Sequence, residues 1–205
     1  MNDKANTAHE DLAFMRNLVE QGNRSQLTGG SLFFAGGMLY GFQTLFHWVE
    51  FKGWIDPPPA VQLAIIAGVT IAFIAVLCVV VWRDHKVGPT GLMGRALAAV
   101  FGGIGLANLA MVFVFGLNAS RTGLLTWMLY PPVIFALQGA AWYTAYQLQK
   151  RSWHGAVAFG WFIAAAALGY AVGNTELYVL IACISLFGLM ALPGFVMMRL
   201  ARQNA

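Results

Sequence analysis

Six long apolar runs, separated by short polar segments, dominate the chain after residue 28. Each run is long enough to cross about 30 Å of hydrocarbon at about 1.5 Å of helical rise per residue. Because the connecting segments are short, neighbouring runs should pair as antiparallel helical hairpins. The pattern therefore predicts an all-α, polytopic membrane helix bundle with six transmembrane helices, at 29–49, 60–82, 94–117, 131–149, 155–173 and 177–199.

The segment before the first run is polar and lacks an apolar core of signal-peptide length. Thr7 and Glu10 have capping-box spacing, and Gly22 is a typical residue just beyond a helix end, which predicts a helix over about 8–21. This helix would be amphipathic, lying on the membrane surface or docked on the cytoplasmic ends of the bundle. Its apolar stripe consists of Leu12, Met15, Leu18 and Val19.

These features divide the chain into three parts. We expect a cytoplasmic N-terminal segment over 1–28, a six-helix transmembrane domain over 29–199 and a cytoplasmic tail over 200–205. The composition agrees, since 59% of the residues are hydrophobic and only 10% are charged, far below the roughly 25% of soluble domains. The net charge of +4 comes from basic residues between apolar runs, which excludes nucleic acid as an expected partner.

The distribution of basic residues predicts the orientation of the bundle. One side of the predicted bundle collects nine basic residues and also Arg95, whereas the other side has only Lys52 and Arg121. Cytoplasmic loops carry the excess of Lys and Arg, so both termini should be cytoplasmic. The nine residues are Lys4, Arg16, Arg24, Arg83, Lys86, Lys150, Arg151, Arg199 and Arg202.

The fourth run begins with Pro131 and Pro132, which cannot donate backbone hydrogen bonds and are favoured at a helix start. One interpretation is a crossing helix that begins at Pro131, preceded by a short interfacial piece over 123–130. The other is a kinked helix that begins near Leu124. Unpaired backbone is tolerated at the interface and costly at depth, which favours the break.

Groups that carry out chemistry are absent from the predicted membrane interior. No ionisable side chain lies near the midplane, no metal-binding or nucleophile motif is intact, and the two cysteines, Cys78 and Cys183, lie at different depths and should be free. We therefore expect no catalytic residue, no metal and no cofactor. General acid–base chemistry would have to use residues at the interfaces, namely His47, Glu50, Asp56, His85 and His154.

Small residues spaced four apart let helix backbones approach closely. Gly37 and Gly41 have this spacing in the first run, Gly102 and Gly103 each follow an alanine at this distance in the third, and Gly169 and Gly173 lie on one face of the fifth. We interpret them as packing positions within the bundle, with a dimer face as the alternative.

Three carboxamides fall at one depth. Counted by helical rise, Gln43, Asn108 and Gln138 lie about 8–12 Å below the outer boundary, and Tyr40 and Tyr170 lie within a turn or two of that level. A carboxamide that faces lipid is unfavourable, so these side chains should point inward. They predict either an interhelical hydrogen-bond cluster or a polar cavity for a small neutral ligand.

Three segments resemble parts of small six-helix inner-membrane proteins of bacteria that have no assigned activity. They are the amphipathic segment 11–20, the sequence Tyr130-Pro131-Pro132, and the ending 192–199 with Leu-Pro-Gly-Phe-Val-Met-Met-Arg. The resemblance implies a multi-pass protein of the bacterial inner membrane with both termini inside. It implies no site residues.

Three functions remain open. The first is an accessory, sensor or regulatory subunit without a catalytic site, which acts on a protein partner through its N-terminal helix or its glycine faces. The second is a carrier or binding subunit for a small neutral solute. The third is a membrane enzyme that uses interfacial residues.

Overall fold

The computed structural model describes the backbone of residues 2–85 and 92–203, and the side chains of residues 26–83 and 93–203. Within these ranges every regular element is a helix, which confirms the all-α prediction. In chain order the helices are α1 (Asn2–Phe51), α2 (Pro59–His85), α3 (Leu92–Thr122), α4 (Leu124–Met128), α5 (Tyr130–Gln149), α6 (Ser152–Ala171), α7 (Thr175–Ser185), the π-helix η1 (Leu186–Ala191) and α8 (Leu192–Gln203).

Helix α1 differs from the prediction. It is one helix of 50 residues, so it neither begins near Ala8 nor ends before Gly22, and Thr7 lies inside it. A glycine within a helix costs only about 1 kcal/mol relative to alanine, and the residues that follow Gly22 all continue the helix. The side chains of the predicted capping box and apolar stripe lie outside the described residues.

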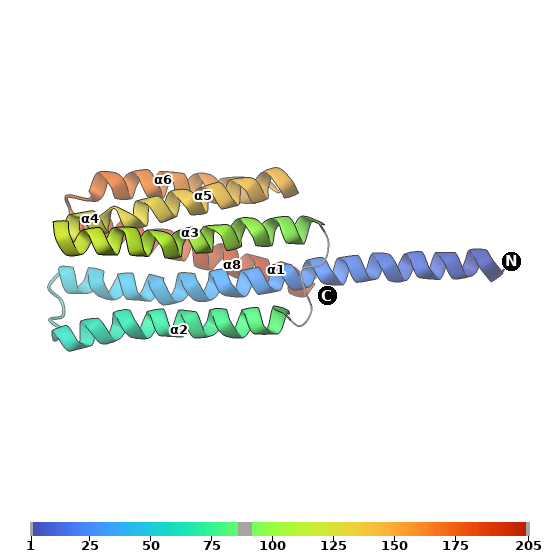
Figure 1. Ribbon diagram of the computed structural model, residues 1–205, viewed down its shortest axis with the longest axis horizontal. Coiled ribbons are helices and arrows are strands. Elements are labelled where there is room, and N and C mark those ends of the chain that lie inside the picture. Colours follow the sequence, from blue (N-terminus) through green and yellow to red (C-terminus); the bar gives the residue numbers. More distant parts are fainter. Residues whose placement is uncertain (1, 86–91, 204–205) are drawn as a thin grey trace.

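Five helical segments are long and apolar enough to cross a membrane by length and composition. The expected run 29–49 is not among them, because its glycines and polar residues such as Gln43 and His47 dilute its apolar character. It forms the part of α1 inside the bundle (Figure 1). The five segments are Pro59–Arg83, Met93–Thr122, Leu124–Gln149, Ser152–Ala171 and Thr175–Gln203.

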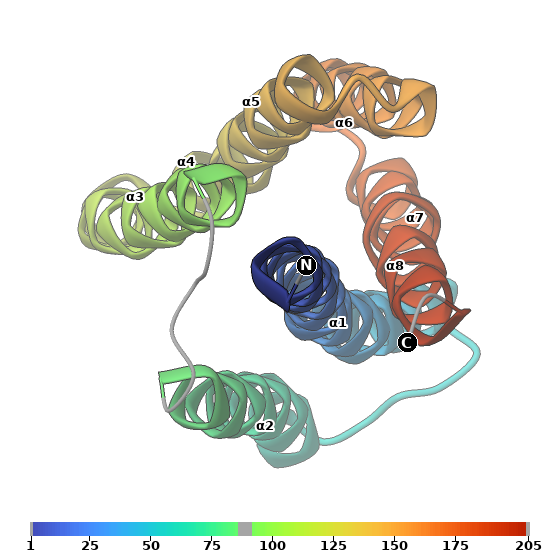
Figure 2. The same cartoon turned by 90° about the vertical axis from the view of Figure 1, so that its right-hand side faces the viewer.

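The bundle is arranged around α1. Viewed along the long axis, α1 lies inside a ring formed by α2, α3, α5, α6 and α7–α8 (Figure 2). Its closest partners are α7, η1 and α8 on one side and α2 on the other. The first half of α1 projects beyond the bundle, at the end where the C-terminus also lies (Figure 1).

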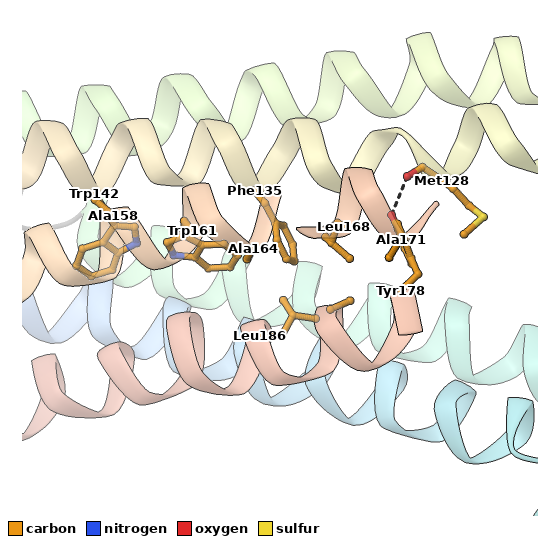
Figure 3. Packing of buried hydrophobic residues seen from close by; sticks show 11 residues of the cluster. Met128, Phe135, Trp142, Ala158, Trp161, Ala164, Leu168, Ala171, Tyr178 and Leu186 are labelled. Carbon is orange, nitrogen blue, oxygen red and sulfur yellow. Dashed lines mark hydrogen bonds between the residues drawn. The ribbon is translucent and has the colours of Figure 1, made fainter. Parts of the chain in front are cut away.

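The core lies between α5, α6 and α7. Trp142, Trp161 and Leu168 are almost completely buried there, and the ring of Phe135 packs edge-on against Trp161 with centroids 4.7 Å apart (Figure 3). By contrast, no described residue of α2 or α3 is buried. Burial is therefore concentrated in the second half of the chain and along α1.

The structure combines features of both interpretations of the fourth run, because a break precedes α5 but Leu124–Gln149 together form one candidate membrane span. Helix α4 is a separate short helix, and α5 begins at Tyr130 with proline in its first turn. The residue between them, Leu129, keeps helical backbone angles, so the chain runs on in nearly the same direction. Pro132 cannot donate to the carbonyl of Met128 four residues earlier, and the Tyr178 hydroxyl donates to that carbonyl instead, at 2.7 Å (Figure 3).

A second proline shapes the last helix. Pro193 has no N–H for the Leu189 carbonyl, and its ring would collide with that carbonyl in a regular α-helix. Residues Leu186–Ala191, which end two positions before Pro193, form the π-helix η1, and the Leu192 N–H after it donates to the carbonyl of Phe187, five residues back. The wider turn accommodates the proline without ending the helix.

Candidate functional site

Of the polar residues predicted at one depth, Asn108 and Tyr40 make polar contacts with a neighbouring helix. The Tyr130 hydroxyl donates a hydrogen bond to the Asn108 side chain, which joins α5 to α3. Tyr40 on α1 lies beside Thr70 of α2, and its ring packs against Phe73 with centroids 5.4 Å apart. Polar contacts therefore join α5 to α3 and α1 to α2.

Gln43 and Gln138 are half-buried, and the amide oxygen of each is inaccessible to solvent. Neither oxygen has a hydrogen-bond partner among the described residues. A buried acceptor without a donor costs roughly 1–3 kcal/mol, so most such atoms in proteins are paired. The amide oxygens of Gln43 and Gln138 are two of six buried side-chain polar atoms that have no partner among the described residues.

Tyr170, by contrast, is not buried. It is 90% exposed, so the expectation that it faces the bundle interior is wrong. Its depth along α6 follows from helical rise, but its direction follows from which face of α6 packs on α5 and α7. That face is occupied by Ala164, Leu168 and Ala171.

The glycines expected at helix contacts fall into two groups. A Cβ atom on Gly37 would lie 2.7 Å from the Ala191 Cα, and one on Gly41 would lie 2.9 Å from the Phe187 ring, so both sit against η1. The same helix pair approaches closely at Gly30 and Gly194, where each Cβ would lie within 3 Å of the other glycine's carbonyl oxygen. A Cβ would have no neighbour within 4 Å at Gly102, Gly103, Gly169 or Gly173.

Sequence reasoning did not find a polar network at the end of the bundle opposite the termini. Glu50, expected in a loop, lies in the last turn of α1, where it contacts His47 at 3.1 Å and accepts a hydrogen bond from Gln62 of α2. Lys52 pairs with Glu176 at the start of α7. This network joins α1 to α2 and to α7. The His47–Glu50 spacing of three residues is the only signal of it in the sequence.

His154 is buried among aromatic rings. Its ring centroid lies 4.0 Å from that of Trp153 and 5.5 Å from that of Trp142. Trp142 in turn contacts Phe33 of α1 and Phe101 of α3. The surroundings of His154 are thus those of a packing residue. Across the described ranges, no three His, Cys, Asp or Glu side chains are grouped so that they could hold a metal ion.

The two cysteines are free, as expected. Cys183 is buried and Cys78 is exposed. Comparison of this chain with protein-family models, with curated proteins and with solved structures finds no match.

Proposed function

We propose that this chain is a six-span protein of the bacterial inner membrane that acts as an accessory, sensor or regulatory subunit on a protein partner. The observation that supports this is the form of α1. Its 50 residues are about 75 Å long, whereas the hydrocarbon layer is about 30 Å thick. Roughly half of the helix therefore extends out of the membrane as a continuation of the central helix of the bundle.

The proposed orientation follows from charge. The ends of α2, α5 and α8 lie at the end of the bundle from which α1 projects, and they carry Arg83, Lys150, Arg151, Arg199 and Arg202. The opposite end has Lys52 and Arg121. An excess of basic residues on the cytoplasmic side places the projecting arm, residues 2–25 of α1, in the cytoplasm. The part of α1 over 29–49 is then the sixth span.

The continuity of α1 gives the arm a means of regulation. Inside the bundle, α1 contacts α2, α7, η1 and α8, so a change in how these helices pack displaces α1. A helix transmits such a displacement along its length because its backbone is hydrogen-bonded throughout. The arm would carry the displacement to a cytoplasmic partner through the stripe of Leu12, Met15, Leu18 and Val19.

Photo-crosslinking in intact cells tests the proposal. A photoreactive residue is placed at Met15 or Val19 on the stripe, and at Arg16 or Glu20 off the stripe as matched controls. We expect one protein adduct of constant mass from the stripe positions and none from the controls. Adducts to lipid, or to this chain's own bundle, would contradict action through a partner.

A second candidate function is the binding of a small neutral solute, and the unpaired amide oxygens of Gln43 and Gln138 favour it. Replacing Gln138 by Leu removes a buried acceptor without a partner, so basal stability should be unchanged or higher. Replacing Asn108 removes a made hydrogen bond and should cost about 0.5–2 kcal/mol. Both are measured by unfolding in detergent micelles.

Substitutions at Gln43 and Gln138 also distinguish a structural hydrogen-bonding role from a ligand-binding role. For a binding site, a screen of neutral solutes should find one that raises the midpoint of unfolding of the natural chain but not of the Gln43→Leu or Gln138→Leu variant. If both substitutions lower basal stability and no solute distinguishes them from the natural chain, the two residues are structural.

A further inference from the structure

A shallow groove of about 340 Å³ runs between the outer surfaces of α5 and α6, near their junction at residues 150–151. Its walls include Tyr143, Tyr146, Ser152, Phe159 and Phe162. Phe159 is 69% exposed and Phe162 is 41% exposed, so the part of the groove farther along α6 is open and apolar. Such a surface fits a hydrocarbon chain.

The end of the groove at the α5–α6 junction is polar and positively charged. The Lys150 ammonium lies 6.0 Å from the centre of the Tyr146 ring and donates to the Gln147 side-chain oxygen at 2.8 Å. Gln147 donates to the Tyr143 hydroxyl, also at 2.8 Å, so the hydroxyl hydrogen of Tyr143 remains available to a ligand. Arg151 follows directly and is exposed.

Within residues 26–83 and 93–203, these two cations, Lys150 and Arg151, have no acidic partner. Arg151 occupies the N-cap position of α6, and its side chain makes no capping hydrogen bond. The Lys150 ammonium and the Tyr143 hydroxyl therefore lie at one end of an apolar groove, and Arg151 directly precedes Ser152 in its wall.

We propose that this groove binds one anionic phospholipid, with its phosphate between Lys150, Arg151 and Tyr143 and an acyl chain along Phe159 and Phe162. The occupant must be both anionic and apolar, and it must lie at the membrane interface. A zwitterionic lipid would place its own cation beside the two basic side chains. Basic pockets between helices on the cytoplasmic side of a membrane have the chemistry to hold anionic headgroups.

The test uses the full chain in detergent, with native mass spectrometry to count bound lipids and titrations of the unfolding midpoint to measure affinity. Phosphatidylglycerol is compared with phosphatidylcholine of the same chains and with glycerol phosphate, which has no chains. We expect one phosphatidylglycerol per protein, bound at least tenfold more tightly than phosphatidylcholine, and no stabilisation by glycerol phosphate. Equal binding of the two lipids, or equal stabilisation by glycerol phosphate, would overturn the proposal.

Two variants locate the site. The double variant Lys150→Gln/Arg151→Gln should bind phosphatidylglycerol about tenfold more weakly or worse, since each basic residue near the surface contributes to attraction of anionic lipid. The matched control Arg83→Gln/Arg95→Gln removes the same charge from exposed positions in other helices and should leave the affinity unchanged. An equal loss in both would mean that only the summed surface charge attracts the lipid, which would refute a built site.

The apolar part is tested at Gly155. A Cβ there would meet the Tyr146 ring only at an ordinary contact distance of 3.4 Å, so the helix tolerates a side chain that projects into the groove. Gly155→Leu should fill the groove and abolish the preference for phosphatidylglycerol without lowering the midpoint measured in its absence. Unchanged phosphatidylglycerol binding in this variant would place the lipid elsewhere.

Discussion

Tyr178 shows how one side chain compensates for a backbone hydrogen bond that a proline removes. Pro132 has no N–H for the carbonyl of Met128, and this carbonyl lies in the buried core, where water does not replace the missing donor. The Tyr178 hydroxyl supplies the donor from another helix. The hydrogen bond that pairs the free carbonyl at the α4–α5 break therefore also holds α7 against this break.

The contribution of the Tyr178–Met128 hydrogen bond to stability can be measured by removing one atom, the hydroxyl oxygen of Tyr178. Tyr178→Phe leaves the Met128 carbonyl buried and unpaired, which should cost about 1–2 kcal/mol of unfolding free energy in detergent micelles. Tyr170→Phe is the matched control, because Tyr170 is 90% exposed and should be neutral. If the two variants lose equal stability, the Tyr178 bond does not support the break.

The sequence predicted the depth of a residue along its helix, but it did not predict the direction in which its side chain points. Helical rise placed Asn108 at the level of Gln43 and Gln138, and it placed Tyr170 within a turn or two of that level, although Tyr170 is exposed. The direction of a side chain around a helix depends on which neighbouring helix packs there, and an apolar run that is hydrophobic all round contains little signal of this. The half-buried network of His47, Glu50 and Gln62 was missed for the same reason.

At the scale of the helices, the α1–α8 interface depends on the absence of side chains. Gly37 and Gly41 lie against η1, and Gly30 and Gly194 bring the two backbones together farther along. The contacts require a helix whose glycines lie on one face at the spacing of one turn. The sequence contained this spacing equally in the third and fifth runs, where the glycines have open space instead.

Replacement by alanine distinguishes the glycines in close helix contacts from the glycines that face open space. Gly37→Ala places a Cβ 2.7 Å from the Ala191 Cα, which must push α1 from η1 and should cost about 1–3 kcal/mol. Gly169→Ala meets nothing and should be neutral or slightly stabilising, since alanine is the better helix former. Unfolding of both variants in micelles gives the comparison, and a Gly37→Ala protein as stable as Gly169→Ala would show that this interface is loose.

At the scale of the whole molecule, the last five runs of the sequence predicted the five candidate membrane-spanning segments to within a few residues at most ends, whereas the first run lies within the longer helix α1. The prolines also located the break before α5. The continuous α1 and the π-helix were not predicted. Capping signals at Thr7 and Gly22 indicate where a helix is able to begin and end, and an unbroken helix across them depends on the rest of the chain offering no competing structure.

The proposed orientation of the bundle predicts which loops are accessible from outside the cell. After Cys78 and Cys183 are replaced, a single cysteine at Asp56 or Ser120 should react with a membrane-impermeant maleimide in intact cells. A cysteine at Lys86 should react only after the cells are opened. Labelling at Lys86 in intact cells would reverse the proposed topology and place the arm of α1 outside.

The π-helix η1 predicts that one residue can be deleted from the last helix without rotating the helix that follows. A π turn holds one residue more than an α turn, so η1 corresponds to a one-residue insertion that leaves α7 and α8 in the same helical phase on either side. Deletion of Gly188 would therefore restore an α-helix without rotating Gly194 away from α1. The regular helix would then confront the ring of Pro193, so the deletion is best tolerated together with Pro193→Ala. The extra residue in η1 and Pro193 therefore depend on each other, and a change to one is expected to require a change to the other.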